Sequence, residues 1–142
     1  MKISARNQFA GTVESVERGA VHAVVAIRVA EDKVIKADIT CEAVDELGLE
    51  AGRECVAVVK ATNVMFAEAG QHLRISARNQ FSGEVASVAE GAVNGRVTIR
   101  TAYGLTVSDS VTNEAIRELG LEAGKPAVAF VKSTDVLVGV EA

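Results

Sequence analysis

One unit, repeated once, accounts for nearly the whole chain, and this repeat constrains the fold more than any other feature. Residues 3–9, with the sequence Ile-Ser-Ala-Arg-Asn-Gln-Phe, return unchanged as residues 75–81, 72 positions later. The same offset holds without a gap from residue 3 to residue 66, and roughly half of the aligned positions are identical. Because an internal repeat indicates a repeated structural unit, the sequence predicts a first domain over residues 1–67, a linker over 68–73 and a second domain over 74–142.

Each unit has the pattern of a small β-barrel. Alternating and Val-rich stretches predict strands over residues 11–16, 21–29 and 33–39. Thr40 then has the position of a helix N-cap and Gly48 that of a helix end. Residues 55–60 and 62–66 are expected to form a strand pair, as are their counterparts in the second unit. Three strands, a short helix and two strands within about 65 residues are typical of an OB-like barrel. We therefore expect an all-β fold with short helices, built as two tandem OB-like five-stranded barrels.

Charge and composition narrow the possible partners. The net charge is −4 and the sequence pI is about 5.2, so the chain as a whole has no positive field to attract a nucleic acid. No leader and no apolar run of ~18 residues is visible, which predicts a cytoplasmic protein with no membrane partner. Cys41 and Cys55 are replaced by Asn113 and Ala127 in the second unit. We therefore expect two reduced thiols that have no role common to both units.

Several polar residues recur in both units, and all of them are hydrogen-bond donors. They are Ser4, Arg6 and Asn7 with Ser76, Arg78 and Asn79, Thr40 with Thr112, and the segment Lys60-Ala61-Thr62 with Lys132-Ser133-Thr134. A helix start adds backbone N–H groups and a partial positive charge. This combination predicts a site for a small anion.

A simpler interpretation stays open for each residue taken singly. Thr40 can serve only as an N-cap, Lys60 only as a solvated strand end, and Arg6 only as a surface charge. Asn7 and Gln8 are expected to hold strand ends together and not to contact a ligand.

No catalytic arrangement is visible in the sequence. His22 aligns with Asn94, and His72 falls in the expected linker, so no histidine recurs as a base or a metal ligand. Ser4 has no histidine in its unit to activate it. We therefore expect a non-enzyme with no catalytic residues and no cation ligands. The main alternative is a nucleic-acid-binding OB module, although aromatic residues for base stacking are sparse. A phosphoryl-transfer enzyme that uses the same anion pocket is a second alternative.

Five segments together resemble the Mop domain of the molybdenum-pterin-binding proteins. They are Ser-Ala-Arg-Asn-Gln at the start, Gly-Ala-Val near residue 20, Ile-Thr before the helix, Glu-Leu-Gly-Leu-Glu-Ala-Gly, and Val-Lys-Ala-Thr-Asn-Val-Met at the end of the unit. Over nearly its whole length the chain resembles a tandem-Mop molbindin. This resemblance implies binding of molybdate or tungstate without a cofactor, for molybdenum storage and homeostasis in the cytoplasm. It also implies a homotrimer whose oxyanion sites lie between subunits. A binder of the pterin cofactor stays open as an alternative.

The resemblance further implies which residues bind the oxyanion. Ser4 and Arg6 of one domain would act with Thr40, Ala43, Lys60 and Ala61 of another. The second unit would supply Ser76, Arg78, Thr112, Ala115, Lys132 and Ser133. The alanines Ala43, Ala61 and Ala115 can contribute only backbone N–H groups. A further site on the symmetry axis is expected near Gly19, Ala20, Val21 and His22, and near Gly91, Ala92, Val93 and Asn94.

Overall fold

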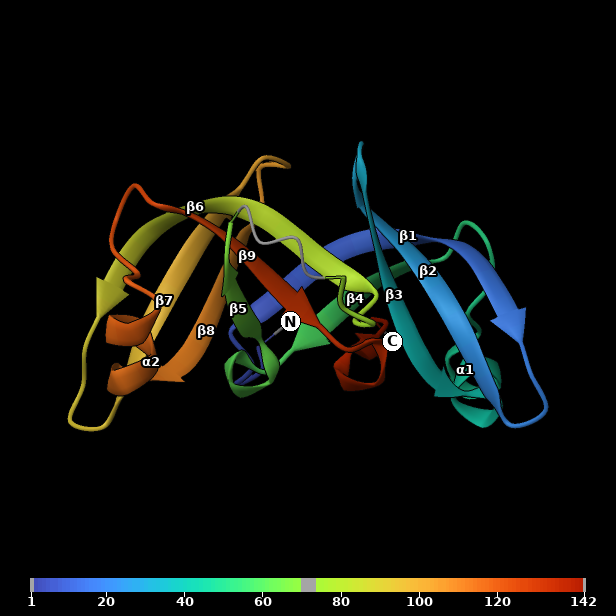
Figure 1. Ribbon diagram of the computed structural model, residues 1–142. Helices are drawn as coiled ribbons and strands as arrows, with labels where there is room; N and C mark the ends of the chain where they lie inside the picture. Colours follow the sequence, from blue (N-terminus) through green and yellow to red (C-terminus); the bar gives the residue numbers. More distant parts are fainter. Residues whose placement is uncertain (1, 70–73, 142) are drawn as a thin grey trace.

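The computed structural model describes residues 2–69 and 74–141 and shows two lobes side by side, each with one short helix (Figure 1). Met1, residues 70–73 and Ala142 lie outside the described residues, and with them most of the expected linker and His72. Each lobe contains a five-stranded antiparallel sheet. The expected fold class, all-β with short helices in two tandem OB-like barrels, is confirmed. In the described part of the chain, no helix has the length and apolar character needed to cross a membrane.

The two repeats form the same elements in the same order. The first contains β1 (Asn7–Arg18), β2 (His22–Ala30), β3 (Lys33–Thr40), α1 (Cys41–Leu47), β4 (Glu54–Val59), the 3-10 turn η1 (Ala61–Asn63) and β5 (Met65–Glu68). The second contains β6 (Asn79–Ala89), β7 (Asn94–Thr101), β8 (Thr106–Thr112), α2 (Asn113–Glu118), β9 (Pro126–Val131), η2 (Ser133–Asp135) and β10 (Leu137–Gly139). Gly48 and Gly120, with φ of 63° and 60°, follow the two helices, as the sequence predicts for helix ends.

The last strand of each repeat belongs to the sheet of the other repeat. One sheet has the order β10-β4-β1-β2-β3 and the other β5-β9-β6-β7-β8. The expected pairing of residues 55–60 with 62–66 is therefore wrong, since β5 pairs with β9 and β10 pairs with β4.

The physical reason lies in the connection between β4 and β5. A two-residue hairpin needs backbone with positive φ, and no residue of the stretch 60–64 has it. Instead η1 leads the chain away from its own sheet toward the other lobe. The domain boundaries at residues 67 and 74 stay a prediction, because each barrel includes one strand from beyond them.

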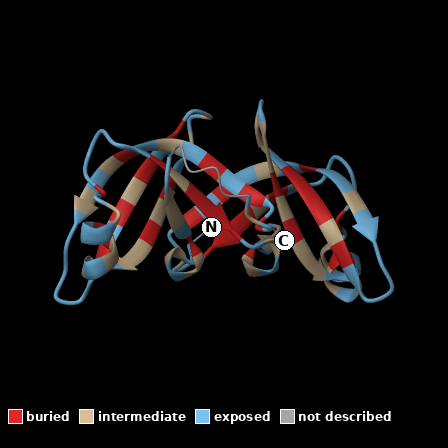
Figure 2. Ribbon diagram, viewed as in Figure 1, coloured by how far each residue is buried: buried red, intermediate tan, exposed pale blue. Residues whose placement is uncertain are grey.

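Buried and more exposed residues alternate along strands such as β7 (Figure 2), so one face of each sheet turns apolar residues toward the core of its lobe. Val25 and Ile27 on β2 correspond to Val97 and Ile99 on β7, and all four have no exposed surface. Between the lobes, Phe9 and Phe81 stack with their ring centroids 5.9 Å apart. The two cores are thus one continuous apolar cluster, which gives two small barrels more buried surface than either repeat could reach alone.

Two buried asparagines connect the repeats. The Asn7 amide donates to the Ser108 carbonyl (2.8 Å) and accepts from the Ser108 N–H (2.7 Å), and Ser108 lies on β8 of the other repeat. The Asn79 amide makes the same two bonds to the backbone of Lys36 on β3, at 2.8 and 2.7 Å. The prediction that Asn7 holds strand ends together is confirmed, because each amide extends a strand edge across the boundary between repeats.

Candidate anion-binding sites

The structure places the repeated Arg and Lys side chains at the same end of a strand ladder. Asn7 pairs with Val59 at the end of the β1–β4 ladder, so Arg6 and Lys60 are the next residues on the two strands. Arg78 and Lys132 have the same relation to the Asn79–Val131 pair. All four side chains are exposed. We call residues 4–6 the first donor arm and residues 76–78 the second donor arm.

None of these four cations has an acidic partner in the part of the chain that the structure describes. The ion pairs found there use other basic residues, namely Arg18, His22, Arg28, Arg117 and Lys125. Ser4 and Ser76 are exposed beside the arginines. The arms and lysines therefore present hydrogen-bond donors and positive charge that the described chain leaves uncompensated.

The two lysines stand at the start of turns that reach across to the other repeat. Lys60 precedes η1 and Lys132 precedes η2 with the same extended backbone. The turn η1 packs against β8, and η2 packs against β3. Lys60 and Ala61 thus lie beside a strand of the second repeat, and Lys132 and Ser133 beside a strand of the first.

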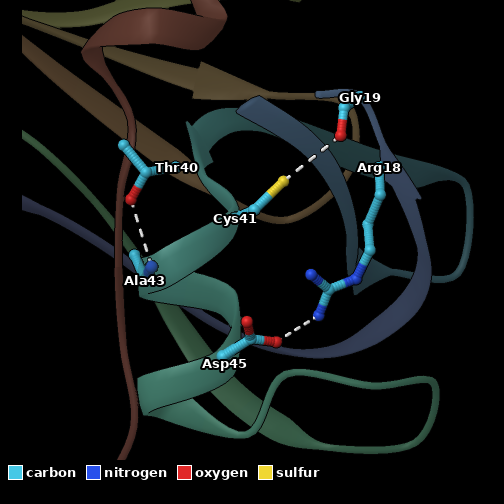
Figure 3. Close-up of polar contacts among 6 residues, drawn as sticks. All are labelled: Arg18, Gly19, Thr40, Cys41, Ala43 and Asp45. Atoms are coloured by element: carbon cyan, nitrogen blue, oxygen red, sulfur yellow. Dashed lines mark hydrogen bonds and ion pairs between the residues drawn. The ribbon is translucent and has the colours of Figure 1, made fainter. Parts of the chain in front are cut away.

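The two threonines cap the helices. Thr40 Oγ1 accepts from the N–H of Ala43 at 3.1 Å (Figure 3), and Thr112 Oγ1 accepts from the N–H of Ala115 at the same distance. The interpretation of Thr40 as an N-cap is confirmed, and the N–H groups of both alanines already have an acceptor. Within residues 2–69 and 74–141, no hydrogen bond joins either threonine to a donor arm or to Lys60 or Lys132. In each repeat the arm and the lysine therefore follow the same strand pair, and no hydrogen bond of the described chain links them to a helix start.

The loops predicted for a symmetry-axis site lie at the two outer ends of the molecule, beside α1 and α2 (Figure 1). All eight residues are exposed, and the loop valines, Val21 and Val93, are 65% and 71% exposed. Each valine carbonyl accepts from the N–H of the first residue of the following helix, at 2.7 Å in the first repeat and 2.9 Å in the second.

Different side chains hold these loops in the two repeats. In the first, the Cys41 thiol donates to the Gly19 carbonyl at 3.6 Å, and Arg18 pairs with Asp45 (Figure 3). In the second, the amide of Asn113 donates to the Gly91 carbonyl at 2.9 Å. His22 contacts Asp38 at 3.1 Å, whereas the corresponding pair is Asn94 and Ser110. Any ligand at these loops would meet two different environments.

Reasoning from the sequence missed two ionisable groups, one fully buried and one half-buried. Asp109 on β8 has no exposed surface, and neither carboxylate oxygen has a hydrogen-bond partner in the described chain. Burial raises the pKa of Asp109 to about 8, and the nearby N–H of Ser110 lowers it only in part. Lys33 is half-buried between the repeats, and burial lowers the pKa of its ammonium group. The sequence did hold a signal for the burial of Asp109. This residue alternates with Val107 and Val111, and alternate residues share one face of a strand.

Other features of the described chain do not point to a different site. Cys41 and Cys55 are free thiols, as expected, and burial raises the pKa of Cys55. No group of three or more His, Cys, Asp and Glu residues gathers there to hold a metal ion. A groove of about 720 Å³ beside the paired strands β1 and β4 is lined by Thr12, Arg53 and Glu54 among others, and by none of the residues predicted to bind an anion.

Comparison with known proteins gives consistent matches. The model of the TOBE domain matches residues 3–66 and 75–138. The chain is 41% identical over 140 residues to the molybdenum transport protein ModE of Azotobacter vinelandii, covering 99% of this chain and 52% of ModE. It is 34% identical over 140 residues to the molybdenum-pterin-binding protein MopA of Rhodobacter capsulatus, covering 99% of this chain and 53% of MopA. The chain thus spans about half the length of these curated relatives. A crystal structure of the cytoplasmic molybdate-binding protein ModG with molybdate bound superposes with a TM-score of 0.95 at 43% identity, covering 99% of this chain and 100% of ModG.

Proposed function

This chain belongs to the TOBE-domain family and is a molbindin with two tandem domains. We therefore propose that it binds molybdate, or the chemically analogous tungstate, and does not catalyse a reaction. The observation that carries this proposal is the pair of matching donor clusters. In each, an exposed arginine and an exposed lysine stand at the same end of a ladder without an acidic partner in the described chain. Such clusters in a chain of net charge −4 favour a small anion over a polyanion.

The chemistry of the cluster suits molybdate. This tetrahedral dianion has no proton at neutral pH and only accepts hydrogen bonds, whereas phosphate is partly protonated and needs an acceptor. Serine, arginine and lysine at each cluster offer donors. Charge-assisted hydrogen bonds contribute about 1.5–3 kcal/mol each, and a micromolar site needs roughly 8 kcal/mol. Four or five good donors would therefore suffice before the costs of association.

We propose that a second chain completes each site. The helix starts at Thr40 and Thr112 are not joined to the arms within the described chain, so we assign the two groups to neighbouring subunits of a homotrimer. Exposed apolar side chains support association, because they occur as equivalent pairs in the two repeats: Val21 with Val93, and Met65 with Leu137. Apolar surface at matching positions is typical of an interface.

The remaining assignments follow from the same family. We propose that Ser4, Arg6, Thr40, Ala43, Lys60 and Ala61 and their counterparts Ser76, Arg78, Thr112, Ala115, Lys132 and Ser133 bind the interface oxyanions, and that the loops at residues 19–22 and 91–94 bind others on the symmetry axis. The occupied N–H groups of Ala43 and Ala115 would then be shared with the threonine hydroxyls. We propose a role in cytoplasmic molybdenum storage and homeostasis.

The test is a double variant, Lys60→Ala with Lys132→Ala. We expect molybdate affinity, measured by titration calorimetry, to fall about tenfold or more, because each site loses one charge-assisted bond. Circular dichroism should be unchanged, since both side chains are exposed. Lys125→Ala is the matched control, because Lys125 is exposed and paired with Glu122 at 3.5 Å. Unchanged affinity in a folded double variant would remove these lysines from the site.

Two further measurements separate this function from its alternatives. Sedimentation should show an oligomer, and a monomer that bound molybdate at full strength would contradict the shared sites. Salt-sensitive binding of an oligonucleotide would favour a nucleic-acid module. Three of the five aromatic rings are too buried for base stacking, because Phe9, Phe81 and Phe130 are 5%, 2% and 9% exposed, whereas Phe66 and Tyr103 are partly exposed.

A further inference from the structure

The second donor arm is attached to the first repeat at its base. The β6 strand begins at Asn79 and pairs with β7 only from Gly83 onward, so residues 79–82 have one edge free of β7. The side-chain amide of Asn79, the first residue of this segment, bonds to the N–H and the carbonyl of Lys36 on β3 of the first repeat. The arm of residues 76–78 therefore joins a segment held by the other repeat.

Lys33 adds a second attachment beside the first. Its ammonium group donates to the Gln80 carbonyl and lies 4.6 Å from the centre of the Phe81 ring and 5.1 Å from that of Tyr103. An ammonium group against aromatic faces is stabilised by their quadrupoles, and the partial burial of Lys33 strengthens these interactions by excluding water. Two residues of β3 thus fix two successive residues of β6.

The first donor arm has only one of these attachments. Asn7 bonds to Ser108 as Asn79 bonds to Lys36. However, Leu105 occupies the position of Lys33, and Glu31 that of Tyr103. No side-chain donor of the described chain bonds to the Gln8 carbonyl. The two arms have the same local sequence and different support.

We propose that Lys33 is a positioning residue for the site that contains Ser76 and Arg78, an inference that rests on the proposed function. A ligand site binds well when its groups are held in place by residues behind them. The Lys33 attachment holds the base of the second arm, and the first arm has no equivalent attachment. The tandem chain therefore carries two unequal classes of interface oxyanion site, with the tighter class at the second arm.

The first experiment compares the arms without any ligand. Lys33→Met keeps the length and apolar contacts of the side chain and removes the ammonium group. We expect faster backbone hydrogen exchange at residues 77–80 and no change at residues 5–8. Leu105→Met is the matched control and should change neither segment, while Lys33→Arg should restore most of the protection. Equal exchange of residues 77–80 in wild type and Lys33→Met would overturn the proposal.

The second experiment measures molybdate affinity by calorimetry in backgrounds that retain one class of site. With Arg6→Ala only the second-arm sites keep their arginine, and Lys33→Met should weaken binding about tenfold, as groups that orient metal ligands do. With Arg78→Ala only the first-arm sites keep theirs, and Lys33→Met should have no effect. Equal losses in both backgrounds, or none in either, would overturn the proposal. Wild-type chain that bound no molybdate would refute the proposed function, whereas the exchange measurement would still report on the Lys33 attachment.

Discussion

The buried carboxyl of Asp109 makes the free energy of unfolding of this protein depend on pH. This carboxyl is fully buried without a partner in the described chain, and its pKa is raised from 3.8 to about 8. Between these values the folded chain keeps a proton that the unfolded chain has released. The free energy of unfolding therefore falls as pH rises, by about 1.4 kcal/mol per pH unit.

The sign and size of the effect follow from this difference in bound protons. Below about pH 4 the Asp109 carboxyl is protonated in both the folded and the unfolded chain, so it does not lower the free energy of unfolding. The loss grows to about 4 kcal/mol at pH 7 and levels off above pH 8. For a domain whose total stability is about 5–15 kcal/mol, this is a large fraction.

The perturbation is Asp109→Ala, because Ala37 occupies the equivalent position of the first barrel and is also fully buried. We expect the variant to be more stable than the wild type at pH 7, and the difference to increase by about 1.4 kcal/mol for each pH unit between pH 5 and pH 8. Urea unfolding at a series of pH values measures it. The packing lost at the smaller side chain lowers the stability difference between variant and wild type by the same amount at every pH. The slope of that difference against pH is unchanged.

Two companion variants make the result decisive. Asp109→Asn keeps the shape without the ionisation and should show the same slope relative to wild type. Thr40→Ala removes no ionisable group and should give a difference that does not vary with pH in this range. A difference for Asp109→Ala that is flat from pH 5 to pH 8 would refute the reasoning and indicate that the carboxyl is ionised and compensated in the folded chain.

Three further substitutions test the contacts between and within the repeats. Asn79→Ala should lower the free energy of unfolding, measured in urea, by about 2–4 kcal/mol, because the part-buried N–H and carbonyl of Lys36 both lose their partner; a loss below ~0.5 kcal/mol would show that water replaces the amide. Thr40→Ala should cost about 1 kcal/mol through loss of the N-cap, whereas Thr40→Ser should recover most of it. Gly83→Ala should cost more than ~2 kcal/mol, because its Cβ would lie 2.3 Å from the Arg100 carbonyl oxygen; an unchanged thermal midpoint would contradict this close approach of β6 and β7.

Local signals in the sequence were sufficient for the elements and for the inter-repeat asparagines. Thr40 and Gly48 mark the start and end of α1 because capping depends on neighbouring backbone alone. The recurrence of Asn beside a strand start predicted that Asn7 holds strand ends. Its partner on β8 could not be named, because that contact joins residues 101 positions apart.

The strand exchange could not be predicted for a different reason. The stretches containing β5 and β10 have similar sequences, so pairing with β4 or with β9 satisfies the same alternation of apolar residues. The choice depends on the path of the chain through η1, where positive φ is absent. The anion-site assignments also stay predictions where they need a second chain, since the register of β1 with β4 relates Arg6 to Lys60 and relates neither to Thr40.

The exchange of β5 and β10 makes each repeat a necessary part of the other's barrel. The covalent connection between the repeats therefore sets the effective concentration at which the two halves meet. Two separate halves would need a bimolecular encounter before either sheet gained its fifth strand, whereas in the tandem chain that encounter is intramolecular. Long-range pairing of this kind is slow to form, and linking the halves removes its dependence on how much protein is present.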